Sequence, residues 1–490
     1  MPTWDSPAID PRIDAVRIHA EPIMNREDAL RELVRSRLEG LGPVTAARLA
    51  EPLNAAEQDI EMALLALEHE GFVMRGRFTE QANEPAAPEE WCERRLLARI
   101  HRYTIKRLRS EIEPVSAADY MRFLFYWQGL TDRPEGPEAL AAIVEQLEGF
   151  SAAAGSWERD ILPARLDMYG SDLLDTLCTT GKSVWLRLAV RAANGEKRTG
   201  PVRNAPITLV DRQAVPYWRE IAPLPELSGK NLTSGANKVL ESLKNNGASF
   251  FIDLVQATGL LRTQVEESLG ELVNWGLVTS DSYAGLRALV TPAGKRPGYA
   301  RRRGRVPAVS GFDRAGRWAL VSGNVEVDRS EALEHIAWVL LRRYGVVFRK
   351  VLERETNLPP WRELLRVYWR MEARGEIRGG RFVQRFAGEQ FALADAVADL
   401  RGIRNRQPDN DRIVISAADP LNLVGIVLPG DRITAQLNNR IVFRNGVPAA
   451  VQIGDEIQAL GGGEVDIESR TMLLRKRKPA GVMRMSGTSA

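Results

Sequence analysis

The sequence predicts a mainly α-helical fold of tandem winged-helix modules, three clear and one or two less regular, followed by a small C-terminal β-barrel. Two observations support the modules: a pattern of three helices and a ribbon over residues 233–292, and a glycine spacing that recurs along the chain. A third supports the barrel, because after residue 395 the apolar residues gather in short, strand-like runs. A winged helix is a helix-turn-helix variant that usually contacts nucleic acid, although it also serves as a protein–protein module.

The clearest module begins at Thr233. Its first helix has apolar residues on one face of a helix with 3.6 residues per turn, namely Ala236, Val239, Leu240 and Leu243. Gly247 ends this helix, and two further amphipathic helices follow before Gly276. We expect Leu277–Val278 to begin a strand and residues 286–290 to pair with it as the wing.

Three pairs of glycines, separated by 29 or 30 residues, mark three modules: Gly42 with Gly71, Gly247 with Gly276, and Gly345 with Gly375. Seven residues after the first glycine of each pair comes a leucine: Leu49, Leu254 and Leu352. Core positions that recur at a fixed spacing indicate an internal repeat. We refer to these modules as the N-terminal (25–82), central (229–293) and C-terminal (329–394) winged helices.

The composition limits the class of protein. A chain of 490 residues is too long for one core. The chain has 67 basic and 64 acidic residues, and its net charge of +3 does not indicate whether it binds polyanions. Local clusters of charge are therefore the relevant evidence. Two cysteines and four histidines exclude a disulfide framework and a structural zinc site, and we predict no cofactor and no metal. No signal peptide or membrane-spanning run is present, which predicts a cytoplasmic protein without a membrane partner.

In chain order, we expect a leader at 1–24, a winged helix at 25–82, and a long basic helix with one or two winged-helix-like units at 83–228. A winged helix at 229–293, a basic linker with strands at 294–328 and a winged helix at 329–394 should follow. The β-barrel then occupies 395–472, and a basic flexible tail occupies 473–490.

The third helices of the modules differ in charge. In the N-terminal winged helix this helix exposes Glu57, Asp59 and Glu61, and carboxylates at a position that would enter a groove repel phosphate. In the C-terminal winged helix, arginines recur at four-residue steps on nearly one face: Arg362, Arg366, Arg370 and Arg374. We therefore predict that the C-terminal winged helix binds nucleic acid.

Two other basic stretches are candidates for contact with nucleic acid. The helix expected near 89–113 has Arg95, Arg99, Arg102 and Lys106, and it is either a solvated face or a surface that follows phosphates. Arg301, Arg302 and Arg303 lie among glycines and prolines, in either a solvated linker or a nucleic-acid arm.

Residues 179–183, with the sequence TTGKS, look like the end of a phosphate-binding loop. The leading glycine of that motif would be position 176, which is Thr176. A phosphate loop joins a strand to a helix, whereas here a predicted helix at 171–179 leads into a predicted strand at 183–188. We expect that strand to pair with 207–210, and we predict no ATP hydrolysis by this chain.

The last part of the chain contains five strand candidates, at 413–415, 424–428, 433–434, 441–443 and 447–453. Asn445–Gly446 lies between two of them and is a strong hairpin signal. So many short strands in a small region predict the barrel.

Residues 416–430, SAADPLNLVGIVLPG, closely resemble the C-terminal region of the large Lhr-type superfamily 2 DNA helicases. GFVMRGRF at 71–78, EPVSAADYMRF at 113–123 and PWRELLR at 360–366 also match. In that family two RecA-like ATPase domains precede such a region, so RecA-like domains in cis or in trans are the implied partners. The resemblance also implies winged helices, a barrel, DNA repair and self-association.

The segment from Ser116 to about Pro216 is similar to the winged-helix DNA glycosylases that include AlkZ, in particular at 121–130 and 169–185. In that family a short motif with a glutamine acts at a damaged base. This resemblance makes Gln128 the candidate catalytic residue, although the second polar residue of the motif is missing.

Three functions follow as hypotheses. The first is a DNA-binding and oligomerisation module of an Lhr-type ATP-dependent helicase in DNA repair, without its own ATPase, which binds single- or double-stranded DNA and forms a closed homo-oligomer such as a tetramer. The second is a DNA glycosylase of the AlkZ-like type, for uracil in the first instance. The third is a purely structural self-association module, which the acidic third helices favour.

Overall fold

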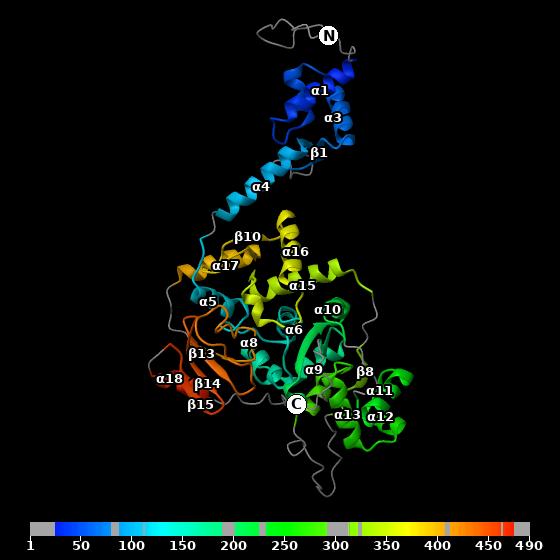
Figure 1. Ribbon diagram of the computed structural model, residues 1–490, viewed down its shortest axis with the longest axis vertical. Helices are drawn as coiled ribbons and strands as arrows, with labels where there is room; N and C mark the ends of the chain where they lie inside the picture. Colours follow the sequence, from blue (N-terminus) through cyan, green and yellow to red (C-terminus); the bar gives the residue numbers. More distant parts are fainter. Residues whose placement is uncertain are drawn as a thin grey trace, which may run out of the picture. The chain divides into compact units, whose positions relative to one another are not determined.

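The computed structural model describes residues 25–79, 88–110, 113–188, 201–224, 232–291, 312, 314–321, 326–406, 412–461 and 464–474. The chain divides into two compact units, residues 1–111 and residues 112–490, and each is considered by itself (Figure 1). About half of the described residues are helical, and the rest of the regular structure forms several small antiparallel sheets.

The first unit is a winged helix followed by a long helix. α1 (Arg26–Leu38), α2 (Ala46–Ala50) and α3 (Glu57–His69) bury Val34, Leu49 and Leu64 in a common core. β1 (Val73–Gly76) pairs antiparallel with β2 (Glu90–Glu93), with Val73 opposite Glu93. A 3₁₀ turn, η1 (Glu51–Leu53), lies between α2 and α3, and α4 (Arg94–Ser110) follows β2 directly. The predicted winged helix is present.

The second unit begins with a winged-helix-like region over residues 115–222. Its helices are α5 (Ala117–Trp127), α6 (Pro137–Gln146), α7 (Ala154–Ser156), α8 (Leu162–Arg165), α9 (Ser171–Thr179) and α10 (Val215–Ile221), with a π-helical turn, η3 (Trp157–Ile161). The 3₁₀ turns η4 (Val202–Asn204) and η5 (Arg212–Ala214) flank β5. β3 (Ala152–Ala153), β5 (Pro206–Asp211) and β4 (Ser183–Leu186) form a sheet in that order. The predicted pairing of the strand at 183 with that at 207–210 is confirmed.

The central winged helix contains α11 (Ser234–Asn246), α12 (Phe251–Thr258) and α13 (Arg262–Asn274), and the four predicted core residues of α11 are all buried. The predicted wing at 286–290 was wrong. Those residues form α14 (Tyr283–Val290), which Ser282 caps and which buries Tyr283 and Leu286. The strand that pairs with β7 (Val278–Ser280) is instead β8 (Arg317–Leu320), which also pairs with β6 (Ser249–Phe250).

The C-terminal winged helix contains α15 (Arg329–Tyr344), η7 (Val351–Arg354) and α16 (Trp361–Ala373), with the three-stranded sheet β10 (Arg378–Gly380), β11 (Gln390–Ala392) and β9 (Val346–Phe348). α17 (Ala394–Asn405) packs against α5 of the preceding region. In Figure 1 α16 is yellow and α17 is orange.

The predicted C-terminal β-barrel was wrong. β12 (Arg412–Ser416), β13 (Arg440–Arg444), β14 (Val447–Ile453) and β15 (Glu456–Ala459) form an open four-stranded sheet in sequential order. The candidate strand at 424–428 does not join this sheet, because its amides close local turns: Val427 and Leu428 both donate to the carbonyl of Leu423. Gly425 adopts a φ of 73° within these turns, a conformation that favours glycine.

The open sheet is covered on both faces. One face joins the main core of the second unit, where Phe443 meets Phe125 of α5 edge-on at 5.2 Å between ring centroids. The other face packs on α18 (Ile467–Leu474), with Val442, Ala450 and Leu473 buried between them. The hairpin between β13 and β14 turns at Asn445–Gly446 as predicted, with φ of 51° and 77°. A sheet covered in this way buries its apolar residues without closing into a barrel.

Two hydrophobic cores organise the second unit. One joins α5, α10, the C-terminal winged helix and the open sheet, and the other joins α6, α9 and β5 to the central winged helix. The 115–222 region contributes to both cores and so connects the other parts of this unit. None of the described helices combines the length and the apolar character that crossing a membrane requires.

Candidate nucleic-acid interface

α16 is an amphipathic helix whose inner face fixes its orientation. Leu364, Val367, Tyr368 and Met371 are buried against α15 and the small sheet, and the Tyr368 hydroxyl donates to the carbonyl of Ala337 at 3.3 Å. The helix begins after Pro360 and ends at Ala373, and Gly375 follows it with a φ of 77°. The opposite face of α16 is therefore held toward solvent.

The exposed face of α16 is basic. Arg362, Arg366 and Arg370 are exposed, and none of them forms an ion pair with another described residue. On a helix with 3.6 residues per turn these positions lie within an arc of about 80°. The glutamate in the first turn, Glu363, is paired with Arg329 at 3.1 Å, so it does not offset their charge. The three guanidinium groups are free to bind phosphate.

Arg374, the fourth residue of the predicted stripe, has a different environment. It pairs with Glu334 at 2.6 Å and with Glu376 at 2.7 Å. The hydrogen bond to Glu376 and these charges raise the pKa of Arg374 above its ordinary value. Arg374 is thus engaged by carboxylates of its own module, unlike the other three arginines.

The wing adds arginines that the sequence analysis did not include among its candidates. Arg378, Arg381 and Arg385 are exposed on β10 and on the loop that leads to β11. The buried side chain of Gln390 shapes this loop: its Oε1 accepts from the amides of Phe382 and Val383 at 2.9 and 2.8 Å. The Gly-Arg-Phe sequence shared by residues 76–78 and 380–382 was the signal that could have found Arg381.

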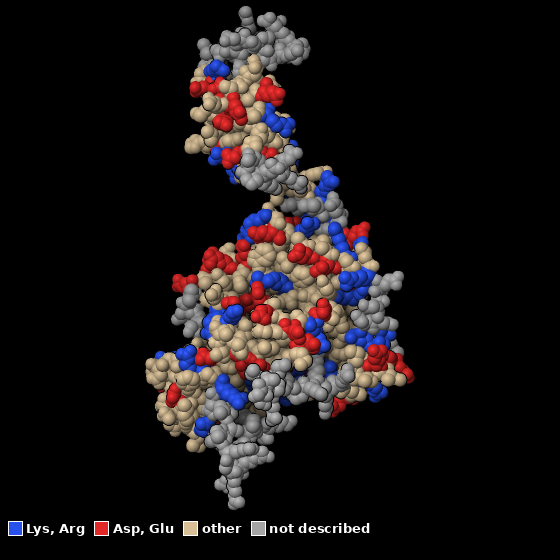
Figure 2. Space-filling model, turned by 180° about the vertical axis from the view of Figure 1, so that it is seen from behind, with Lys and Arg blue, Asp and Glu red and all other residues tan. Residues whose placement is uncertain are grey.

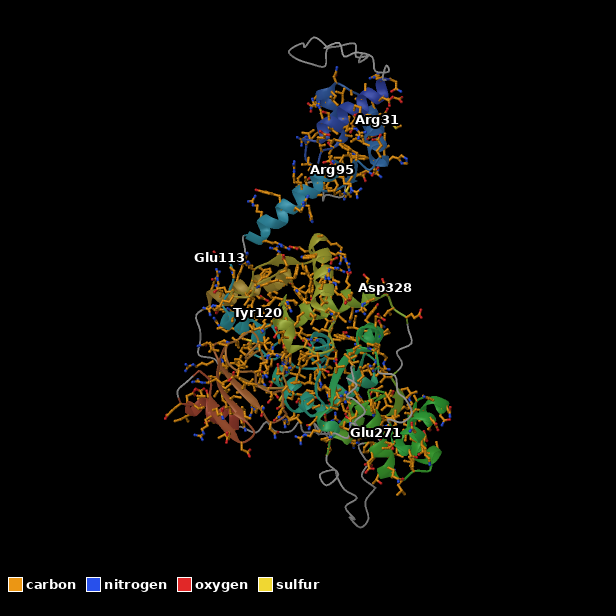
Figure 3. The ribbon with its side chains drawn as sticks, viewed as in Figure 1. Arg31, Arg95, Glu113, Tyr120, Glu271 and Asp328 are labelled. Atoms are coloured by element: carbon orange, nitrogen blue, oxygen red, sulfur yellow. The ribbon has the colours of Figure 1, made fainter. Side chains whose placement is uncertain are left out.

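A second basic surface lies in the first unit, along α4. Arg95, Arg99 and Arg102 are exposed beside a groove of about 880 Å³ that Arg35 and Phe72 also line. The guanidinium of Arg35 lies 4.8 Å from the centre of the Phe72 ring. Arg95 lies at the start of α4 (Figure 3). The carboxylate of Glu93 caps this end of the helix by accepting from the amides of Arg95 and Leu96. The groove therefore combines cations with an aromatic ring, although Glu39, Glu70 and Glu93 also line it and Glu70 pairs with Arg35.

Other predicted basic residues are less informative. Lys106 lies in α4, but its side chain is outside the described part of the chain. Arg301, Arg302 and Arg303 lie entirely outside the described residues. In Figure 2, blue and red side chains are interspersed over the face of the second unit that is turned to the viewer.

The third helices of the other winged helices are acidic. α3 contains Glu57, Asp59 and Glu61 and no lysine or arginine. In α13, Glu271 accepts from both the amide and the hydroxyl of Thr233, at 2.9 and 2.6 Å. Among the third helices of the winged helices that the structure describes, α16 has the most basic exposed face.

Gln128, the candidate catalytic residue, is buried at the end of α5 and only 1% exposed. Its Oε1 accepts from Nη2 of Arg165 at 2.6 Å, and its Nε2 donates to the carbonyl of Arg343 at 2.8 Å. Both ends of the amide are bonded to protein groups. For Gln128 to reach a base, this end of α5 would have to open.

A surface hollow of about 620 Å³ lies within the second unit, between η4 and the loop before β13. Its lining is rich in amide side chains, with one cation: Asn204, Gln436, Asn438, Asn439 and Arg203. Amides both donate and accept hydrogen bonds, as a nucleobase edge requires. The described residues that line it include no carboxylate, and no described group of three or more His, Cys, Asp or Glu side chains is arranged to hold a metal ion.

The Gly181–Lys182–Ser183 turn connects α9 to β4, so it joins a helix to a strand. This is the order that the sequence predicted. It is the reverse of the order in a phosphate-binding loop.

Comparison with known proteins shows that the chain is similar to one group of helicases. Residues 115–208 and 326–412 match models of the third and the fourth winged-helix domain of the large helicase-related protein. The chain is 28% identical over 428 residues to a protein of Mycolicibacterium smegmatis described as Lhr helicase/probable uracil glycosylase. It is 29% identical over 440 residues to the Escherichia coli Lhr helicase/uracil glycosylase.

Both alignments cover 82% of this chain and 27% of the relative, so the chain spans about a quarter of the length of these relatives. Two segments of the chain thus match Lhr winged-helix domains, and the chain is similar to Lhr over most of its length. The resemblance to the C-terminal region of Lhr-type helicases is confirmed.

Proposed function

We propose that this chain is the DNA-binding and self-associating C-terminal part of an Lhr-type ATP-dependent helicase, and that it acts in DNA repair in the cytoplasm. ATP hydrolysis would belong to RecA-like domains, in cis or in trans. The names of the two relatives support the helicase context, since both are described as Lhr helicases. The winged helices support binding to DNA, because this fold usually contacts nucleic acid.

One observation carries the proposal: Arg362, Arg366 and Arg370 share one exposed face of α16 and have no ion-pair partner among the described residues. In a winged helix the third helix is the one that approaches nucleic acid. Unpaired guanidinium groups there bind phosphates and release counterions, which drives association in a salt-dependent way.

The test is binding of the full chain to labelled single-stranded and duplex DNA at several salt concentrations. We expect Arg362→Ala/Arg366→Ala/Arg370→Ala to weaken binding to all sequences and to lower the slope of log K against log salt by about 0.9 per lost phosphate contact on duplex. The matched control is Arg374→Ala, since Arg374 is already paired with Glu334 and Glu376. An unchanged slope in the triple variant would contradict the assignment of α16.

A second candidate function is excision of a damaged base such as uracil. The observation that favours it is that both relatives are described as uracil glycosylases or probable ones. The segment similar to AlkZ-type glycosylases contributes one side of the hollow beside η4, with Arg203 and Asn204, and the loop before β13 contributes the other amides. Base chemistry requires a base turned out of the stack into a pocket. Alkali cleavage of uracil-containing strands after incubation with the chain separates this function from DNA binding alone.

A further inference from the structure

Trp369 is an exposed tryptophan at the edge of the basic face of α16. Its side chain is 46% exposed, whereas every other tryptophan in the described part of the chain is buried or partly buried. Trp369 makes no hydrogen bond and no ring contact with a described residue. An indole left in water at such a position costs free energy that burial would recover.

The position of Trp369 relative to the arginines follows from helix geometry. Arg362, Arg366, Trp369 and Arg370 lie within an arc of about 100° on a helix with 3.6 residues per turn. Arg366 and Arg370 are four residues apart, about 6 Å along the axis, with the indole between their levels. The face therefore presents a flat aromatic ring with cations on the same side.

This combination suits a strand whose bases are not paired. Single-strand binding sites join basic groups, which follow the backbone, to aromatic rings on which bases stack. In a B-form duplex the bases are already stacked on each other and show only their edges in the groove. Arg and amide side chains form hydrogen bonds with those edges. An indole ring needs the exposed face of a base for stacking, and an intact duplex does not offer one.

We infer that Trp369 is a base-stacking residue and that α16 prefers single-stranded DNA, or the unpaired part of a junction, over intact duplex. This inference rests on the proposed binding of DNA by α16. Phosphates of the strand would bind Arg362, Arg366 and Arg370, and one base would stack on the indole. The exposed wing residues Arg378 and Arg381 would extend the contact along the backbone.

The test compares wild type with Trp369→Ala on three probes: a labelled oligothymidylate, a strand of the same length made of abasic sites, and a duplex. We expect Trp369→Ala to weaken binding to oligothymidylate by about 5- to 150-fold, the range that base–aromatic stacking provides. Binding to the abasic strand and to duplex should change less than about twofold, and the salt slope should stay the same because no cation is lost.

Three further variants make the result specific. Trp369→Phe should keep most of the affinity for oligothymidylate, because a phenyl ring also stacks. Phe250→Ala, which removes another exposed aromatic ring of the same unit, should have no effect. Arg362→Ala/Arg366→Ala/Arg370→Ala should weaken binding to all three probes.

Equal losses on single strand and duplex, or no loss on either, would overturn the inference while leaving DNA binding intact. If Trp369→Ala changed the mass of the protein in light scattering but not its binding to strands, Trp369 would be a protein contact and the inference would be wrong. If wild type bound none of the probes, the proposed function itself would fail.

Discussion

The guanidinium of Arg165 and the carboxylate of Asp419 form a bidentate ion pair, at 2.7 and 2.8 Å, although the two residues are 254 positions apart. Both side chains are buried, Arg165 at 0% and Asp419 at 1% exposure. Arg354 donates to the Asp419 carbonyl at 2.9 Å. Asp419 lies in the 416–430 stretch that most resembles the Lhr-type helicases, and this pair ties that stretch to the 115–222 region.

We expect Asp419→Ala to destabilise the second unit strongly. Removing one partner of a buried ion pair leaves an uncompensated charge, which costs about 3–5 kcal/mol. The measurement is the midpoint of urea unfolding followed by circular dichroism. The double variant Arg165→Met/Asp419→Leu is the control, because it leaves no unpaired buried charge and should lose less stability than Asp419→Ala alone. A single variant as stable as wild type would contradict this account of the pair.

Gln128→Ala should lower stability as well, by about 1–3 kcal/mol, because Arg165 and the carbonyl of Arg343 would each lose a buried hydrogen-bond partner. The measurement is again the unfolding midpoint, combined with a uracil-excision assay on the folded fraction. A variant with wild-type stability and no excision would instead support a catalytic role for Gln128.

The parts of the fold that the sequence predicted are those set by local spacing. The α11 stripe of Ala236, Val239, Leu240 and Leu243 is buried because a helix needs only its own periodicity to define a face. Asn445–Gly446 turns a hairpin for a similarly local reason, since both residues tolerate positive φ.

The errors concern partners that are distant in sequence. β7 pairs with β8, which begins at Arg317, so no pattern within the central module could identify it. The apolar run at 424–428 has strand-like composition, but it forms local turns against the main core. At the candidate interface, the spacing placed four arginines on one face, yet the pairing of Arg374 with Glu334 depends on how α16 packs beside α15.

We predict that the purified chain does not hydrolyse ATP. Gly181 and Lys182 lie in a turn from α9 into β4, and the Lys182 carbonyl accepts from the amide of Arg212, which extends the pairing of β4 with β5. DNA-stimulated phosphate release should stay at background in wild type and in Lys182→Ala alike. Release in wild type that disappears with Lys182→Ala would contradict the prediction.

The arginines of α4 should contribute to binding independently of α16. We expect Arg95→Ala/Arg99→Ala/Arg102→Ala to lower the salt slope by about 0.7 per lost contact on single strands, and to do so additively with the α16 variant. Arg26→Ala is a control on α1 of the same unit, because Arg26 is paired with Asp59 at 3.4 Å. If the α4 variant bound DNA with the wild-type slope, this face would be a solvated helix surface.

The last prediction is self-association through the N-terminal winged helix. Its third helix, α3, repels phosphate with Glu57, Asp59 and Glu61, but it also exposes Met62 at 69% and Leu65 at 43%. Exposed apolar side chains within a charged rim mark protein–protein contacts more often than nucleic-acid contacts. Soluble proteins that pair through such faces usually form closed homo-oligomers, and a tetramer is our expectation.

A stable interface would have to bury roughly 1,200 Å² or more in total, which two side chains alone do not supply, so more of this module must take part. Light scattering on the full chain should give a multiple of 54.6 kDa at micromolar concentration. A chain without residues 1–82, or the variant Met62→Lys/Leu65→Lys, should contain fewer subunits per particle than wild type. Its circular dichroism spectrum should show that the second unit is still folded. A wild-type monomer would refute self-association. An oligomer that survived both changes would place its interface in residues 83–490, because neither Met62 nor Leu65 would then be needed to hold it.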